Sequence, residues 1–169
     1  FGIDAPLAGW ILTSYLLCGA VAAPILGSLG DRYGHRLILL ATLGTFVAGG
    51  VLAALAPTLP VLLVGRVLQG ASTATFPLAL AIVRRHTAGD AQRSATGWLS
   101  GTMGLGAGAA LVVGGVIVET LSWHWLFVTG AAMGVLSIVL AVIFVPASQR
   151  GQAARTDWPG TALLTVGLL

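Results

Sequence analysis

The chain alternates between long apolar runs and short polar connections. Five runs predict complete helices, at about 7–27, 37–56, 61–83, 95–118 and 125–145. Each holds about 20 residues, which at about 1.5 Å per residue spans a hydrocarbon core of about 30 Å. A sixth apolar run begins at Pro159. The pattern therefore predicts an all-α membrane protein, a bundle of transmembrane helices.

Prolines and capping residues mark the connections. Pro57 and Pro60 enclose a turn, because a helix interior does not tolerate proline without strain. Thr156 or Asp157 is the expected N-cap of the last helix, with Pro159 in its first turn. The predicted organisation is a five-helix bundle, a cytoplasmic linker and the start of a further helix, at 1–146, 147–158 and 159–169.

Composition supports a membrane location and excludes several other classes. The chain is 57% hydrophobic and 8% charged, whereas soluble domains carry about a quarter charged residues. A large soluble core would need a polar outer shell that so few charges cannot supply. The first run is too long for a signal peptide and has no basic leader. One cysteine, Cys18, supports neither a disulfide framework nor a metal cluster, so no metal and no cofactor is expected.

Charged and aromatic residues predict the orientation. Lysine is absent, and seven of the eight arginines fall in alternate connections, which the positive-inside rule places in the cytoplasm. They are Arg32, Arg36, Arg84, Arg85, Arg93, Arg150 and Arg155. Tryptophans fall near both predicted boundaries, at Trp10, Trp98, Trp123, Trp125 and Trp158. The net charge of +3 thus follows from topology in a plasma or inner membrane, and no nucleic-acid partner is expected.

The connection GSLGDRYGHR joins the first two predicted helices. Gly34 can supply a left-handed turn at negligible steric cost, which suits a tight connection between antiparallel helices. Asp31 could form an ion pair at the membrane edge with a nearby basic side chain. The candidates are Arg32, His35 and Arg36. The alternative is a solvated turn whose arginines serve topology alone.

A second polar feature lies inside the third run, at Arg66, Gln69 and Gly70. An intramembrane arginine costs roughly 2.5–3.5 kcal/mol at a helix centre on insertion scales, so it usually faces a cavity or a partner. Arg66 and Gln69 are three residues apart and share a helix face, which favours a cavity. The alternative is an arginine that extends to the nearby outer interface.

The fourth run is rich in glycine. Gly104 and Gly108, followed by Gly114 and Gly115, give small-residue spacings that permit close contact between helices. A dinucleotide-binding fingerprint is excluded, because Ala109 stands where the last glycine belongs and no βαβ unit is predicted.

The first of these motifs resembles a signature of the major facilitator superfamily: glycine-x-leucine-alanine-aspartate-arginine-x-glycine-basic-basic, between its second and third helices. The matches are Gly27, Leu29, Asp31, Arg32, Gly34 and Arg36. In that family the charged residues of this loop form part of a conformational latch, which the resemblance extends to His35. Histidine replaces the usual basic residue there and has an unperturbed pKa of about 6.5, so the latch is a candidate for pH sensitivity.

The other two motifs also resemble that superfamily. The family's arginine-x-x-glutamine-glycine motif of helix four, associated with proton coupling, matches Arg66, Gln69 and Gly70. Its antiporter signature in helix five, glycine-proline-x-x-glycine-glycine, matches at Gly114 and Gly115. Ala110 and Leu111 stand where the signature has glycine and proline, so the implication of antiport is weaker.

WILTSYLL and WHWLF are similar to the fourteen-helix drug:proton antiporter branch, which has arginine where this chain has His124. The resemblance implies the N-terminal half of a major facilitator fold lacking its first helix. With the arginine connections cytoplasmic, Phe1 begins on the outer side, so an odd number of preceding helices is expected.

The implied function is secondary active transport by alternating access, in the form of proton-coupled efflux of drugs or other small organic molecules. The implied partners are the substrate, protons, the lipid bilayer and a C-terminal half. A facilitator or importer of small metabolites in the same superfamily is the alternative. An intramembrane enzyme is less favoured, since neither HExxH nor GxSxG occurs. A channel is a further, less favoured alternative.

Overall fold

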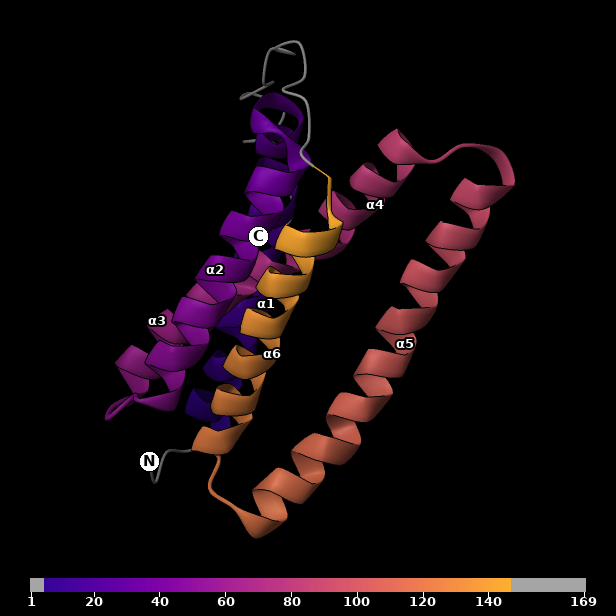
Figure 1. The fold of residues 1–169 in the computed structure, drawn as a ribbon. Coiled ribbons are helices and arrows are strands. Elements are labelled where there is room, and N and C mark those ends of the chain that lie inside the picture. The colour runs from indigo at the N-terminus through magenta and orange to yellow at the C-terminus, as the bar shows by residue number, and fades with distance from the viewer. Residues whose placement is uncertain (1–4, 147–169) are drawn as a thin grey trace.

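The computed structural model describes residues 5–146, and every regular element within them is a helix (Figure 1). In order they are α1 (Ala5–Tyr33), α2 (His35–Ala54), α3 (Leu59–Gly70), the 3₁₀ helix η1 (Ala71–Ala74), α4 (Thr75–His86), α5 (Gly89–Thr120) and α6 (His124–Phe144). Among the described residues, five spans are long and apolar enough to cross a membrane, with Leu59–His86 counted as one. The predicted all-α bundle is confirmed, and the linker and sixth helix lie outside the described residues.

The helices extend further into the polar connections than the apolar runs suggest. Helix α1 continues to Tyr33 and α2 begins at His35, so Gly34 alone separates them. Gly34 has a φ of 102°, a conformation that side-chain-bearing residues rarely adopt. Helix α5 begins at Gly89 instead of near residue 95. Polar residues form helix readily, so the apolar pattern marks membrane burial and not where a helix ends.

The span predicted at 61–83 is interrupted at its centre by η1. Pro77, in the first turn of α4, has no N–H to donate to the carbonyl four residues earlier, which weakens the regular ladder there. The hydroxyl of Thr73 lies 3.1 Å from the Gly19 carbonyl oxygen of α1 and 3.0 Å from that of Gly70. The interruption is therefore tied to the neighbouring helix by a side chain from η1.

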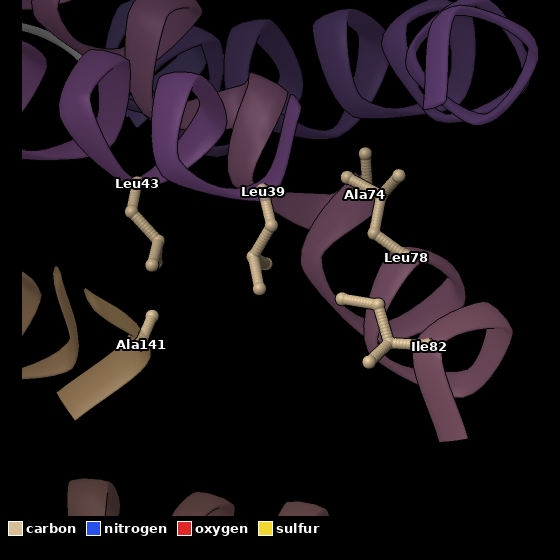
Figure 2. Close-up of a cluster of buried hydrophobic side chains, with 6 residues drawn as sticks. All are labelled: Leu39, Leu43, Ala74, Leu78, Ile82 and Ala141. Carbon is tan, nitrogen blue, oxygen red and sulfur yellow. The ribbon is translucent and has the colours of Figure 1, made fainter. Parts of the chain in front are cut away.

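Helix α2 is the centre of the packed part and contacts α1, α3, η1, α4 and α6. Figure 2 shows a buried cluster that joins four of these elements. Its members are Leu39 and Leu43 of α2, Ala74 of η1, Leu78 and Ile82 of α4, and Ala141 of α6. Helix α5 instead lies apart over most of its length and contacts only α4 and α6 among the described elements (Figure 1).

Glycine brings α2 and α3 into backbone contact. A Cβ atom on Gly49 would lie 2.6 Å from the Gly65 carbonyl oxygen, and one on Gly65 would lie 2.8 Å from that of Gly49. A Cβ atom on Gly134 of α6 would lie 2.7 Å from the Val47 side chain of α2. The described chain thus has close-packing glycines outside the run where the sequence predicted them.

The glycines predicted for helix packing lie on α5. Gly104, Gly108 and Gly115 have no described neighbour within 4 Å of a Cβ position. Gly114 has one at an ordinary contact distance, the Leu126 side chain at 3.7 Å. Close packing by these four glycines stays a prediction.

Candidate functional site

Arg66 lies where α3 meets α1 and α6. Its Nε donates a hydrogen bond to the Ile11 carbonyl oxygen at 3.0 Å, and its Nη1 donates to Gln69 Oε1 at 2.9 Å. The guanidinium carbon is 4.6 Å from the centre of the Tyr15 ring and 6.0 Å from that of Phe127. These groups come from three helices that are far apart in the sequence.

This environment holds the charge of Arg66 without a carboxylate. Within residues 5–146 no ion pair to Arg66 occurs, and its side chain is half-buried. Cation–π contacts with desolvated rings contribute about 0.5–2 kcal/mol, and a charged donor bonded to a carbonyl adds a comparable amount. The guanidinium is thus oriented by neutral groups and keeps its positive charge available for an anionic group.

Gln69 and Gly70 complete the motif with different roles. Gln69 is 3% exposed and presents its carbonyl oxygen to Arg66. Its amide nitrogen lies against Gly50 of α2, where a Cβ atom would approach it to 3.3 Å. A Cβ atom on Gly70 would lie 2.6 Å from the Tyr15 carbonyl oxygen. Gln69 therefore orients the arginine, and Gly70 lets α1 approach α3 closely enough for Tyr15 to reach it.

The second polar cluster lies at the Gly34 connection. Asp31 Oδ1 is 3.2 Å from Arg85 Nη2 of α4 and 3.4 Å from His35 Nε2 of α2. His35 is 3% exposed, whereas the Asp31 side chain is 60% exposed. A single carboxylate thereby links the ends of α1, α2 and α4.

The remaining residues of the predicted latch make other contacts. Arg36 Nη2 donates to the Val142 carbonyl oxygen of α6 at 2.7 Å. The Arg32 guanidinium stacks 5.2 Å from the centre of the neighbouring Tyr33 ring. Gly27 has no neighbour within 4 Å of a Cβ position in the described chain. Of the three partners proposed for Asp31, only His35 is found beside it, and together the motif residues connect four helices.

Sequence reasoning did not assign three residues of these clusters. Tyr15 was identifiable in principle, because an aromatic hydroxyl in an apolar run is uncommon. Phe127 was noted only as part of WHWLF, for its resemblance to the antiporter branch, and its residue type gave no sign of a contact with Arg66. Arg85 could not be separated from Arg84, because helix rotation alone decides which of two adjacent arginines faces Asp31.

A metal centre is not formed by the part of the chain that the structure describes. No group of three or more histidine, cysteine, aspartate or glutamate side chains there is arranged to hold an ion. The contacts observed in the two clusters are hydrogen bonds, ion pairs and cation–π contacts.

Comparison with known proteins agrees with these motifs. The family model of the Major Facilitator Superfamily matches residues 1–168. A multidrug resistance protein B homolog of Mycobacterium tuberculosis is 28% identical over 169 residues, covering 99% of this chain and 31% of that protein. A putative multidrug resistance protein of Klebsiella pneumoniae is 35% identical over 161 residues, covering 94% of this chain and 34% of that protein. The chain therefore spans about a third of the length of the curated relatives it matches.

A solved structure has the same fold. The crystal structure of a human organic anion transporter superposes with a TM-score of 0.75, covering 93% of this chain and 37% of that one. The sequence identity is 18%, so the likeness concerns the arrangement of helices alone.

Proposed function

The chain belongs to the major facilitator superfamily, a family of transporters and not of enzymes, and we propose that it serves proton-coupled efflux of drugs or other small organic molecules. The names of the relatives support the substrate class: several are called multidrug resistance proteins, at 27–35% identity. We place it in the cell membrane with its arginine-rich connections in the cytoplasm, following the positive-inside rule.

The observation that carries the proposal is the Arg66 site. An arginine inside a membrane span is costly, and Ile11, Gln69 and Tyr15 offset part of that cost. Because of the cost, such arginines usually mark functional sites. Its positive charge favours the ionised form of any carboxylate that approaches. The attraction between the two groups weakens when that carboxylate takes up a proton. Arg66 can thus make a proton-binding step sensitive to which conformation the transporter occupies.

The acidic partner in this scheme comes from outside the described residues. Within residues 5–146 the acidic side chains are Asp31, Asp90 and Glu119, all near helix ends. We therefore assign the proton-binding carboxylate to another part of the protein or to the substrate. Gln69 orients Arg66 toward it, and Gly70 keeps α1 close.

The Asp31 cluster serves as the conformational latch in this proposal. Its contacts to Arg85 and His35 join helix ends that would have to shift during alternating access. An exposed ion pair is weak, about 0–1 kcal/mol, so it can break and re-form in each cycle.

A facilitator or importer is the second candidate. It is favoured by one observation, the Ala110 and Leu111 pair that stands where the antiporter signature has glycine and proline. Such a protein would equilibrate its substrate across the membrane without accumulating it.

The test uses the complete protein in cells loaded with ethidium. Efflux against the ethidium gradient, abolished by a protonophore, supports a proton-coupled exporter, and equilibration alone supports the facilitator. Arg66→Ala is expected to reduce uphill efflux at least about tenfold with normal membrane insertion. Arg66→Lys keeps the positive charge but loses the two hydrogen bonds of the guanidinium group. This variant therefore shows whether efflux needs the charge alone or the hydrogen bonds as well. Arg155→Ala is the charge-matched control, and normal uphill efflux by Arg66→Ala would refute the coupling role.

A further inference from the structure

An open surface hollow of about 680 Å³, called the polar cavity below, lies between the end of α4 and the beginning of α5, and most of its lining residues are exposed. Its lining differs from the apolar surface that covers the rest of α5. The residues are Arg84, Gly89, Gln92, Arg93, Thr96, Gly97 and Ser100. Neither the Arg66 site nor the Asp31 cluster contributes to this lining.

The lining is rich in donors and carries positive charge. Arg84 and Arg93 supply guanidinium groups, and the other polar side chains are one amide and two hydroxyls. No carboxylate is among the lining residues, although Asp90 lies 3.4 Å from Arg93 in a pair that is almost fully exposed. The Asp90 carboxylate offsets part of the charge of Arg93, whereas none of the ion pairs among the described residues includes Arg84. Arginines together with hydroxyl and amide donors form a set that suits a phosphate group.

The cavity lies at the depth of lipid headgroups. Helix α5 has 32 residues and is therefore about 48 Å long, whereas the hydrocarbon core is about 30 Å thick. The excess falls at its polar beginning, since the lining residues of α5 end at Ser100 and the residues beyond are almost all apolar. Trp98, which is 74% exposed, lies in the same turns, and tryptophan favours the membrane interface.

We propose that this cavity binds the headgroup of an anionic phospholipid. The phosphate lies between Arg84 and Arg93, with hydroxyl donors from Thr96 and Ser100, and the acyl chains follow the exposed apolar surface of α5. This site shares no residue with the Arg66 site. Arg85, next to Arg84, is engaged by Asp31 and belongs to the latch.

The test is native mass spectrometry of the complete protein, titrated with phosphatidylglycerol or with phosphatidylcholine. Each juxtamembrane arginine contributes about 1 kcal/mol toward anionic lipid, which corresponds to about fivefold in affinity. Arg84→Gln and Arg93→Gln should each weaken phosphatidylglycerol binding about fivefold, and Arg84→Lys should weaken it less. Arg32→Gln is the matched control, since it removes the same charge from the same end of the molecule without touching the cavity.

Three results would overturn the proposal. The first is equal retention of phosphatidylglycerol and phosphatidylcholine by the unmodified protein. The second is a loss in Arg32→Gln as large as in the cavity variants, which would mean a diffuse electrostatic attraction. The third is displacement of phosphatidylglycerol by an equimolar amount of inorganic phosphate, which would make the cavity a site for a free anion. Circular dichroism of each variant verifies that the helices are intact.

Discussion

Helices α2 and α5 carry the same small-residue pattern in different surroundings. In α2, Gly49 and Ala53 are four residues apart, and both face Gly65 of α3, with a Cβ atom on Gly65 placed 2.9 Å from Ala53 Cβ. In α5, Gly104 and Gly108 have the same spacing, yet nothing in the described chain lies within 4 Å of a Cβ position at either. One pattern forms a backbone contact, and the other has no close neighbour within the described residues.

Small-residue spacing therefore permits contact between helices but does not create it. Apolar helices gain no hydrophobic free energy by meeting inside a bilayer, so association depends on van der Waals contact and hydrogen bonds. The α2–α3 contact also positions Gln69, whose backbone nitrogen would be 2.9 Å from a Cβ atom on Gly49. Packing and site are thus coupled in α2 and α3, whereas α5 carries its polar cavity independently of that contact.

The largest expected effect is on the free energy of unfolding, and it compares a glycine-to-alanine substitution in α2 with one in α5. Gly49→Ala places a methyl group 2.6 Å from a backbone oxygen of α3, so the helices must move apart, at a cost of about 1–3 kcal/mol. Gly104→Ala meets no atom of the described residues within 4 Å and is expected to gain up to about 1 kcal/mol of helix propensity. Unfolding of the complete protein in detergent, followed by circular dichroism, measures both. An equal loss in the two variants would show α5 to be as tightly packed as α2.

The second prediction compares the two glycines with positive φ, one at the start of each helix. Gly34→Ala is expected to cost about 2 kcal/mol, because φ 102° with ψ 129° is nearly restricted to glycine. Gly89→Ala is expected to cost about 1 kcal/mol, since φ 60° lies in the left-handed region that asparagine also tolerates. The same unfolding experiment applies, and Gly89→Asn should recover most of the loss. A larger loss of unfolding free energy in Gly89→Ala than in Gly34→Ala would contradict this prediction.

The third prediction concerns the ring that supports Arg66. Tyr15→Leu removes the cation–π contact and should lower uphill efflux about fivefold at equal protein level, while Tyr15→Phe should retain most of it. Trp98→Leu, an aromatic exposed on α5, is the control and should have little effect. The pH profile of efflux tells positioning from a general packing defect, because only the former shifts the profile. Unchanged uphill efflux by Tyr15→Leu would show that Tyr15 is not needed to position Arg66.

The smallest expected effect compares two exposed aspartates. Asp31→Asn weakens the contacts to Arg85 and His35 and should slow maximal transport about two- to fivefold with little change in substrate affinity. Asp90→Asn, on α5, should leave both parameters unchanged, since its pair with Arg93 is almost fully exposed. Initial rates over a range of substrate concentrations separate the two quantities. Poorer affinity at an unchanged maximal rate would contradict the latch.

Much of the fold was accessible from the sequence. Each apolar run is about 20 residues long, which matches the thickness of the bilayer, so the number of runs predicts the number of spans. The conformation of Gly34 was also predictable, since few other residues turn a chain so tightly. The ends of the helices were harder to predict from the sequence. Helix α5, for example, begins at Gly89, several residues before its apolar run. The interruption at η1 lies next to Pro77, which the sequence shows, whereas the hydrogen bond from Thr73 to Gly19 is a contact that no local pattern encodes.

The order of residues is enough to identify this chain as a membrane-spanning helical bundle and to single out its charged and polar residues, Arg66 and Asp31 foremost. Composition and periodicity are sufficient for that, because burial in lipid acts on each residue separately. The partners of these residues are visible only in the folded bundle: Ile11 and Tyr15 for Arg66, Arg85 for Asp31, and Gly65 for Gly49. These pairings depend on how each helix is rotated about its axis, which is set by close packing between helices and not by the preference of any residue for lipid.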